Sequence, residues 1–584
     1  MRIVLSLFLS LVVYALLGIV LPASAAEFNV VIDRNYTIES DGLVRVTEVH
    51  RVTNNSNNLL ISKSNQETFQ IPIVGSGEDL LQKSVDTAVV NVGGVNLPFT
   101  TVLNENFAEL KVAYPSELRR GQTLTFTLTY TNFGLSEKSG SLIDIYAPGF
   151  VSDFNFTQGL TTVRYNTVYR ISNQLPEINF VLPETATTEV GDNYTTISFS
   201  QESLLGRTIW IQLGRTQHYY FKISLQAIAT DSNNTGYMNE YRMILPRDID
   251  EAAVTQEVFF ASINPEPFQV LEDTEGNLVG YFKTPSHITT EISVVGYARV
   301  SMKDNGLKPE LVTGQSDLPT DLVSFYTLPA EYWEVDNEQI QEVASTLKGN
   351  ETNVYKIVEN TYDFVVQNID YSEIKRFGIN ERQGALRTLN GGAAVCMEYS
   401  DLFLTLIRAQ GIPARAAFGY GYDPKEPENA QEGHQWVEVY MPGIDSWVSV
   451  DVTWGENGRS LIGGDLNHFY THVAGEGPNN PTFVERVSYG SSSPLDLPSY
   501  IFNAIEEIPA NSTRTAADLL KEYPEVQKTD IEVITDRFIN GFREFIFGTE
   551  PSRNGRVLVL AGIILTSGAI LMLMLTMLRS KKTA

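Results

Sequence analysis

The spacing of apolar residues changes once along this chain of 584 residues, and this change limits the folds that the chain can adopt. Up to about residue 303, apolar and polar residues alternate in short runs, which is typical of β-strands with one buried face. After about residue 321, apolar residues recur every three or four positions, which is typical of amphipathic helices. The body of the chain is also too long for one hydrophobic core. We therefore expect a multidomain protein in which all-β domains precede an α+β domain.

Two all-β domains are expected before the change in period. β-Branched and aromatic residues alternate with polar ones in runs separated by Asn, Ser and Gly clusters; the clearest runs are 43–54, 108–115, 122–133, 195–201, 218–230 and 287–301. We predict a β-sandwich over residues 27–149 and a second β-rich, sandwich-like domain over residues 150–303. Neither range holds His, Cys or acidic residues at metal-ligand spacing.

The next part of the chain is expected to carry a linker and then the α+β domain. Residues 304–325 are polar and contain Gly and Pro, so they are predicted to form the linker. The α+β domain is predicted over residues 326–490, with helices near 336–350 and 353–371. Residues 491–555 contain an amphipathic pattern between about 510 and 550, which favours a helical stalk.

Both ends of the chain are apolar. Residues 1–26 combine Arg2, an apolar run and an Ala-Ser-Ala cleavage site, which is typical of a secretory signal peptide. An uncleaved membrane anchor is the alternative at this end. Residues 556–578 are predicted to form a single transmembrane helix, since 22 apolar residues span ~33 Å. The tail, residues 579–584, carries Arg and Lys and is expected in the cytoplasm, although Arg553 and Arg556 on the other side weaken this charge asymmetry. The cleaved signal peptide independently places the body of a single-pass cell-membrane protein outside the cytoplasm.

The net charge of the chain is −28. Such a charge argues against nucleic acid as a partner and against docking on an anionic membrane surface. It fits a solvated extracytoplasmic protein. The only bilayer contact expected is therefore the one through the C-terminal helix.

Cys396 is the only cysteine, so no intramolecular disulfide can form. A lone thiol is either an inert core residue or a reactive one. Gly391-Gly392 permits a tight turn before Cys396, and an apolar helical face follows it until Gly411. Cys396 is therefore predicted at a helix N-terminus, where unpaired N–H groups and the helix dipole favour a thiolate.

Two downstream strands offer partners for the Cys396 thiol. The segments 432–442 and 446–456 are strand-like and can pair as a hairpin about Pro442-Gly443. That pairing brings His434, at the start of the first strand, near Asp451, at the end of the second. A helix packed on this sheet can bring Cys396 to His434. The spacing is compatible with a Cys–His–Asp triad.

These blocks resemble the transglutaminase-like superfamily, which has a papain-like thiol fold. The residues that carry the resemblance are Cys396, Tyr399, Leu402-Phe403, Gly411 to Arg415, His434, Trp436 to Val439, and Trp447 through Asp451 to Thr453. The resemblance covers about residues 330–480. It implies that Cys396 is the nucleophile, His434 the general base and acid, and Asp451 the residue that orients the imidazole. Many members have Gly two residues before the cysteine, whereas this chain has Ala394, which affects the expected oxyanion hole.

Other residues in this region are candidates for binding. Trp436, Trp447 and Tyr420 are candidates for the substrate cleft, with simple core packing as the alternative. His468 and His472 are four residues apart, a spacing that suits a metal only on a helix, and no third ligand is evident. We therefore predict no metal and no cofactor.

Two functions of different classes fit the sequence. The first is a cell-surface thiol enzyme that acts on amide bonds of protein or peptide substrates through a thioester, with peptidase or amidase action favoured over cross-linking. The second is a catalytically inert envelope scaffold or adhesion protein that binds a partner through its β-sandwich domains. The reactivity of Cys396 discriminates between them.

Overall fold

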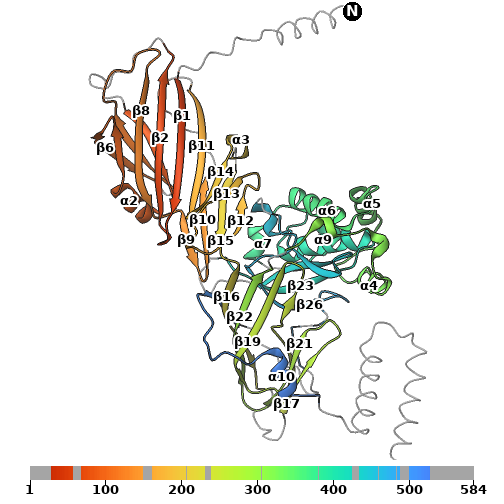
Figure 1. The fold of residues 1–584 in the computed structure, drawn as a ribbon. Helices are drawn as coiled ribbons and strands as arrows, with labels where there is room; N and C mark the ends of the chain where they lie inside the picture. The colour runs from red at the N-terminus through yellow and green to blue at the C-terminus, as the bar shows by residue number, and fades with distance from the viewer. Residues whose placement is uncertain are drawn as a thin grey trace, which may run out of the picture. The chain divides into compact units, whose positions relative to one another are not determined.

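The computed structural model (Figure 1) describes residues 28–525, with gaps at 57–67, 76, 105, 149–160, 205–206, 230–237, 304–305, 379–380, 424–432, 458–459, 480, 482 and 487–498. The predicted signal peptide (1–26), transmembrane helix (556–578) and tail (579–584) lie outside the described residues, as does most of the predicted stalk. Among the described residues, no helix combines the length and the apolar character needed to cross a bilayer.

The N-terminal β region is built around an eight-stranded sheet. Its strands, in spatial order, are β13 (Thr187–Val190), β14 (Tyr194–Phe199), β11 (Thr161–Ser172), β1 (Phe28–Ile38), β2 (Val44–Asn54), β8 (Thr123–Asn132), β4 (Val89–Val92) and β5 (Val95–Leu97). Every second side chain of β1 and of β2 is buried, so the alternation in the sequence corresponds to one covered face. The predicted strands at 43–54 and 122–133 are confirmed as β2 and β8.

Two smaller sheets and two helices complete this region. They are the sheet of β3 (Thr68–Val74), β7 (Phe107–Ala113) and β6 (Phe99–Leu103), the sheet of β12 (Ile178–Leu182), β15 (Thr208–Leu213), β10 (Leu142–Pro148) and β9 (Ser136–Ser139), and the helices α2 (Glu78–Asp86) and α3 (Gln201–Leu204). One core of buried residues extends from Phe28 to Leu213.

The predicted domain boundary at residue 149/150 is wrong. β11, which follows that boundary, pairs in parallel with β1 over its whole length, from Phe28 opposite Thr161 to Ile38 opposite Ile171. Both strands therefore belong to one sheet, and the first β region ends near Leu213. The alternation pattern shows that both segments are strands, but it does not show which strand pairs with which.

The second β region consists of two sheets that share a core. One sheet has the order β18 (Ile249–Asp250), β19 (Val254–Asn264), β22 (Thr290–Met302), β16 (Thr216–Ala227) and β28 (Ser499–Ile505), and the other has the order β20 (Gln269–Glu272), β21 (Leu278–Pro285), β17 (Met238–Leu245) and β27 (Val484–Arg486). Side chains from both sheets form one buried cluster. This region starts at Thr216, later than the predicted residue 150.

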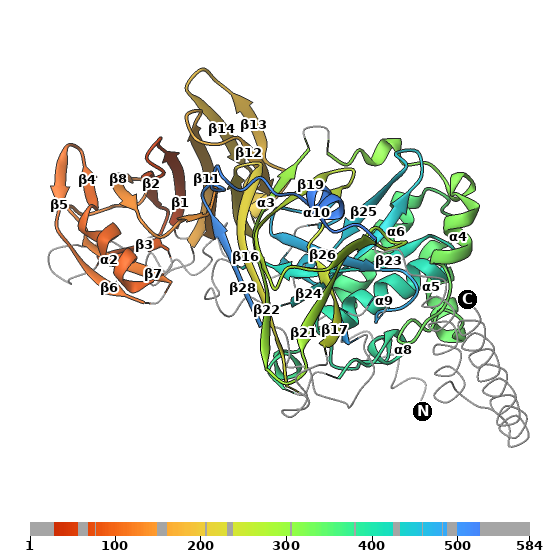
Figure 2. The same cartoon turned by 90° about the horizontal axis from the view of Figure 1, so that it is seen from below.

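The prediction of a helical stalk over residues 491–555 is wrong for its first described segment. Residues 499–505 form β28, which pairs antiparallel with β16 and lies beside it in Figure 2. The side chains of residues 499–502 alternate in burial, and Phe502 is buried against Tyr219. The short helix α10 (Ala516–Glu522) follows and buries Leu519 in the core of the second β region. This part of the chain is therefore packed into the second β region.

The predicted linker, residues 304–325, is also packed. It contains the 3-10 turns η1 (Pro309–Leu311) and η2 (Gln315–Asp317) and most of the helix α4 (Thr320–Tyr326). Val312 and Leu318 are buried in the core of the α+β domain. The backbone N–H of Thr313 donates to the carbonyl of Pro442.

The α+β domain packs the helices α5, α6 and α8 and a four-stranded sheet around the central helix α9. The elements are α5 (Glu338–Lys348), α6 (Val354–Asn368), α7 (Glu373–Arg376), α8 (Ala385–Leu389), α9 (Cys396–Ala409), η3 (Trp454–Asn457), and the sheet of β25 (Ser446–Val450), β24 (Gly433–Met441), β23 (Ala414–Gly421) and β26 (His468–Ala474). Asn337 and Asn353 cap α5 and α6 with their side chains, as expected for helix starts.

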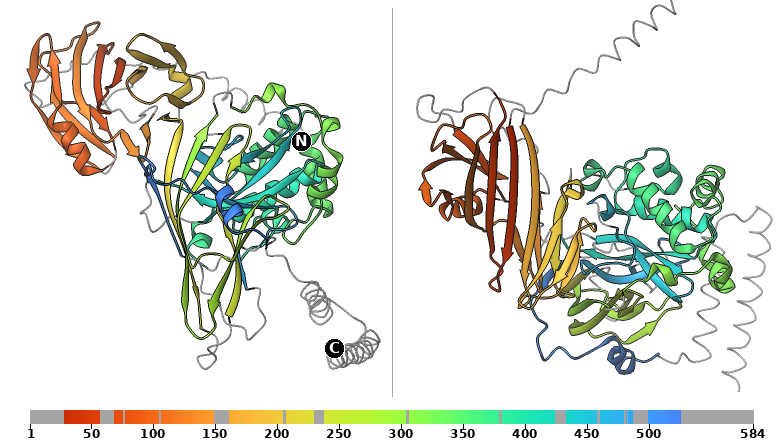
Figure 3. Two further views of the ribbon diagram at one scale, coloured as in Figure 1. Left: turned by 60° about the horizontal axis from the view of Figure 1, so that its bottom comes forward. Right: turned by 45° about the horizontal axis from the view of Figure 1, so that its top comes forward.

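This sheet is covered on both faces. On one face, α9 and its neighbours share a core with β24 and β25; on the other, Tyr420 and Phe469 join the core of the second β region. The right panel of Figure 3 shows the helices and the strands of the second β region on opposite sides of the sheet. α9 is buried almost along its full length, because the sheet and α5, α6 and α8 surround it. The position of its first residue, Cys396, is therefore fixed by packing.

Candidate active site

Cys396 is the first residue of α9, as the sequence predicted, and its side chain is partly exposed. The N-terminus of the helix is fixed by Glu398, which accepts a hydrogen bond from the backbone N–H of Val395 at 3.2 Å. Glu398 is fully buried and forms an ion pair with Lys375 at 2.7 Å. Because Lys375 balances this carboxylate, the helix N-terminus presents its positive end to Cys396 with little opposing charge.

The predicted hairpin is confirmed. β24 and β25 pair antiparallel, with Val437 opposite Val450 and Met441 opposite Ser446. This register brings the start of β24 to the residue that follows β25. His434 Nε2 and Asp451 Oδ2 lie 2.9 Å apart, and both side chains are buried.

Cys396 contacts the same imidazole. The thiol is close enough to His434 to raise the pKa of the imidazole, through hydrogen bonding and through its charge. Because Nε2 of His434 faces Asp451, Nδ1 is the ring nitrogen left for the thiol. The three residues that we predicted from the sequence thus lie next to one another in the order Cys396, His434 and Asp451.

His434 and Asp451 each stabilise the charged form of the other. Burial alone lowers the pKa of His434, but the charge and hydrogen bond of Asp451, with a further contribution from Cys396, raise the pKa to about 10. Burial likewise opposes ionisation of Asp451, but His434 and then His468 hold its pKa far below its usual range. The imidazole is therefore favoured in its protonated form beside an ionised carboxylate.

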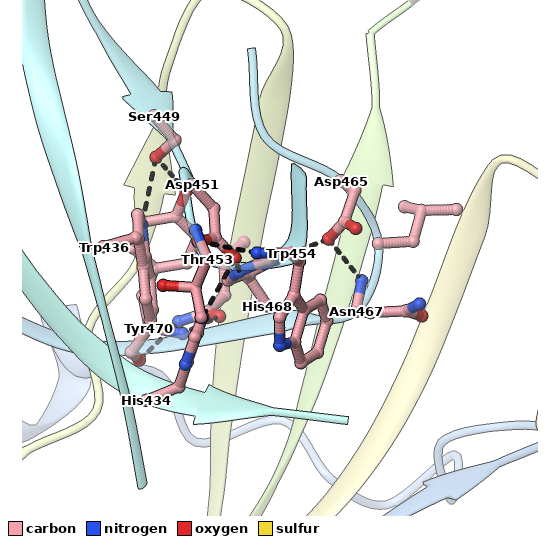
Figure 4. Close-up of polar contacts among 12 residues, drawn as sticks. His434, Trp436, Ser449, Asp451, Thr453, Trp454, Asp465, Asn467, His468 and Tyr470 are labelled. Carbon is pink, nitrogen blue, oxygen red and sulfur yellow. Dashed lines mark hydrogen bonds and ion pairs between the residues drawn. The ribbon is translucent and has the colours of Figure 1, made fainter. Parts of the chain in front are cut away.

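Asp451 has a second histidine partner that the sequence did not reveal. His468 Nε2 lies 3.0 Å from Asp451 Oδ2, and His468 Nδ1 lies 2.6 Å from Asp465 Oδ1 (Figure 4). The other oxygen of Asp451 accepts the backbone N–H groups of Thr453 at 2.8 Å and Trp454 at 3.4 Å. Both oxygens of this buried carboxylate are therefore occupied by donors.

Aromatic rings enclose the two histidines. The ring of Trp454 stacks on His434 with centroids 5.1 Å apart and an interplanar angle of 25°. The ring of Trp436 lies 5.9 Å from His434 and meets His468 edge-on at 4.8 Å. These rings keep water from the imidazole–carboxylate contacts, which strengthens the contacts.

Two glycines of β23 make room for these rings. A Cβ atom on Gly421 would lie 2.5 Å from Trp454 Cζ2, and one on Gly419 would lie 2.9 Å from Trp436 Cη2 and closer still to the carbonyl of Phe469. Glycine at alternate positions of a strand is a sequence signal for such close approach. The segment Gly419-Tyr420-Gly421 carried that signal.

The three cleft candidates have other positions. Tyr420 is 5 % exposed and packs against Tyr500, Phe502 and Phe469, so it belongs to the core shared with the second β region and does not line a cleft. Trp447 lies at the other end of the hairpin from Asp451, under the guanidinium of Arg415 at 4.3 Å. Trp436 is 1 % exposed and supports the histidines from within the domain. Core packing, the alternative interpretation, describes Tyr420 and Trp436, whereas Trp447 is partly buried and packs against the core of the α+β domain.

The prediction about the spacing of His468 and His472 also has a clear outcome. Both residues lie on the strand β26, so the helical arrangement required for a shared metal is absent from this segment. His472 stacks on Phe418 with centroids 4.7 Å apart, and burial lowers its pKa to about 3.

His434, Asp451 and His468 are the described residues whose ligand atoms are close enough to hold a metal ion, all within 4.8 Å of one another. Two histidines and one carboxylate suit a transition metal. Asp451 Oδ2 lies 2.9 Å from His434 Nε2 and 3.0 Å from His468 Nε2, which are hydrogen-bond distances, and the adjacent carboxylates raise the pKa of each histidine against the effect of burial. The cluster thus forms a hydrogen-bonded network.

A cavity of about 450 Å³ adjoins the turn that leads to Cys396. It is lined by residues 368–374, Thr388 and residues 391–393. Its two walls are joined where the backbone N–H of Ser372 donates to the carbonyl of Ala394 at 2.8 Å. Ala394, the departure from the family pattern, is fully buried at this junction.

The fold and these residues define a transglutaminase-like domain. Residues 341–452 match the family model of the transglutaminase-like superfamily, a match that includes Cys396, His434 and Asp451. The resemblance to the transglutaminase-like superfamily that the sequence shows is thus confirmed for this part of the chain. No curated protein matches the sequence.

Solved structures show remote similarity. A protein from Cytophaga hutchinsonii, provisionally described as a cysteine protease, is 17 % identical with a TM-score of 0.35, over 52 % of this chain and 96 % of that chain. A provisionally described protease from Parabacteroides distasonis is 12 % identical with a TM-score of 0.18, over 75 % of this chain and 72 % of that chain. An M1 zinc metallopeptidase from Deinococcus radiodurans is 10 % identical with a TM-score of 0.19, over 32 % of this chain and 42 % of that chain.

Proposed function

We propose that this protein is a thiol enzyme that cleaves or transfers amide bonds of protein or peptide substrates through a thioester on Cys396. One observation carries the proposal: His434 contacts Cys396 and lies 2.9 Å from Asp451, while Cys396 begins a buried helix. A thiolate at a helix N-terminus beside an imidazolium is the usual state of an activated cysteine nucleophile.

The reaction follows from these positions. The Cys396 thiolate attacks the amide carbonyl carbon, and the tetrahedral oxyanion accepts a hydrogen bond from the backbone N–H of Cys396, which has no partner within the helix. His434 gives its proton to the departing amine, which leaves a thioester on Cys396. Water or an acceptor amine then gives a proton to His434 and displaces the thiolate. Asp451 holds the imidazole in place during both steps.

We favour water as the acceptor, and thus peptidase or amidase action over cross-linking. We place this activity outside the cytoplasm, on the basis of the predicted signal peptide and the predicted membrane segment. Protease added to intact cells is expected to remove the chain up to about residue 550. Full protection of the chain would contradict this placement.

The test of the activity is the reactivity of Cys396. Iodoacetamide at mildly acidic pH is expected to modify Cys396 rapidly in the folded protein, and His434→Ala is expected to abolish that rapid reaction. Peptide mass spectrometry identifies the modified residue. A thiol that reacts only after denaturation would contradict the proposal and favour the scaffold function. Cys396 adducts formed in an envelope extract would identify the substrate class.

A further inference from the structure

His468 has a carboxylate at each ring nitrogen. Nδ1 lies 2.6 Å from Asp465 Oδ1, and Nε2 lies 3.0 Å from Asp451 Oδ2. Asp465 Oδ1 also accepts the backbone N–H of Asn467 at 2.8 Å. Ionised carboxylates only accept hydrogen bonds, so beside them both nitrogens of His468 donate. Burial lowers the pKa of His468, but Asp465 and Asp451 raise it above its ordinary value, which favours the imidazolium.

The ring of His468 is held firmly. It is 2 % exposed, and the rings of Trp436, Trp454 and His434 lie 4.8, 4.9 and 5.3 Å away, respectively. It enters from β26, which pairs with β23, so it reaches Asp451 from a different strand than His434 does. The two histidines thus approach the same oxygen of Asp451 from two sides.

The charges along this network alternate. Asp465 is negative, His468 positive, Asp451 negative and His434 positive when it holds a proton. A buried carboxylate with one cationic partner faces a large desolvation penalty, and a second cationic donor offsets part of that penalty. His468 therefore adds to the contribution of His434 in keeping Asp451 ionised, and it provides a second donor that holds the Oδ2 atom in place.

We propose that His468 is a positioning residue of the active site, which holds the Asp451 carboxylate so that it orients His434 toward Cys396. This inference rests on the proposed function. His468 does not touch the substrate or the reacting atoms; it acts through Asp451. This role requires that contacts continue without a break from Asp465 through His468, Asp451 and His434 to Cys396.

The test measures the rate of Cys396 alkylation by iodoacetamide at neutral pH in the full chain, together with the thermal midpoint of unfolding. His468→Phe keeps a ring in the same space but removes both donors, and it is expected to slow alkylation about 10- to 100-fold, as for loss of a hydrogen bond to a charged group. His468→Gln, which keeps one donor, is expected to restore part of that loss. A merely structural role does not predict this order at equal thermal midpoints.

His472→Phe is the matched control. His472 is a buried histidine on the same strand, but it stacks on Phe418. Its replacement is expected to leave the alkylation rate within about two-fold of the unsubstituted protein. Equal losses in His468→Phe and His472→Phe would overturn the proposal, as would an unchanged rate in His468→Phe.

Two further variants keep the proposal testable if His468→Phe does not fold. His468→Gln is expected to fold and to react more slowly than the unsubstituted protein, and Asp465→Asn, which keeps the ring, is expected to slow the reaction to a smaller extent. Unchanged rates in both would overturn the role of His468. An unreactive thiol in the unsubstituted protein would instead overturn the proposed function itself, so the two failures are distinguishable.

Discussion

Ser400 Oγ donates a 2.8 Å hydrogen bond to the backbone carbonyl of Gln435. Ser400 lies one helical turn after Cys396 on α9, and Gln435 follows His434 on β24. This buried contact therefore joins the two elements that carry the proposed nucleophile and the proposed base. It fixes the distance between them more directly than apolar packing alone.

Ser400→Ala is expected to loosen this connection. The carbonyl of Gln435 loses a buried donor, which should lower the free energy of unfolding by ~1–3 kcal/mol. The alkylation rate of Cys396 should also fall several-fold, because the helix and the strand can shift relative to each other. Urea unfolding and mass spectrometry measure the two effects. Ser324→Ala, which removes an exposed serine hydroxyl on α4, is the control and should change neither.

Asp451→Asn tests the residue that orients the imidazole. The asparagine amide is neutral, so it cannot accept charge-assisted hydrogen bonds from both histidines as the carboxylate does. His434 therefore loses the partner that raises its pKa. By analogy with other triads, the rate of the proposed reaction should fall by a factor on the order of 10²–10⁴. Asp445→Asn, at the exposed turn of the same hairpin, should retain the full rate. Equal rates in the two variants would contradict the assignment of Asp451.

The raised pKa of His434 predicts a pH dependence of stability. In the folded protein the pKa of His434 is raised to about 10, whereas the ordinary pKa of a histidine is 6.5. The stabilisation from protonated His434 is therefore complete below about pH 6.5 and is lost as the pH rises toward 10. The difference in unfolding free energy between the unsubstituted protein and His434→Gln should shrink by a few kcal/mol, in order of magnitude, between pH 6 and pH 10. A difference that stays constant over this range would contradict the ion pair.

Gly421→Ala should disturb the site through packing. The added Cβ would lie 2.5 Å from the ring of Trp454, so that ring must move from its stacked position on His434. Overpacking of this kind typically lowers the free energy of unfolding by ~1–3 kcal/mol. The alkylation rate of Cys396 should fall as well. Gly433→Ala is the control on the neighbouring strand, since the nearest atom to its added Cβ lies 4.0 Å away; a rate as low as that of Gly421→Ala would contradict a specific role for Trp454.

Much of the α+β domain follows from local sequence. The helix that starts at Cys396 and the hairpin about Pro442-Gly443 are both local elements, so periodicity and turn residues are enough to predict them. Because the hairpin register is local too, the meeting of His434 and Asp451 could be predicted. The contact with Cys396 required only that the helix pack on the sheet.

Features that depend on long-range pairing could not be predicted in this way. The parallel pairing of β1 with β11 joins segments more than 120 residues apart, and no local pattern encodes it. His468 reaches Asp451 only because β26 pairs with β23 on the side opposite β24. Tyr420, which lies between Gly419 and Gly421, is a candidate for the substrate cleft when only the sequence is considered. Those glycines instead let aromatic rings approach the strand.

The strand β28 gives the last test, because its place in the second β region was not expected. Phe502 is 1 % exposed and stacks on Tyr219 of β16 with centroids 4.5 Å apart. Phe502→Ala should therefore lower the free energy of unfolding by ~3–5 kcal/mol, as for other buried phenylalanines. Its neighbour Ile501 points the other way and is 42 % exposed, so Ile501→Ala should cost far less. Equal effects of the two substitutions in urea unfolding would contradict the strand, because a strand with one buried face requires adjacent residues to differ.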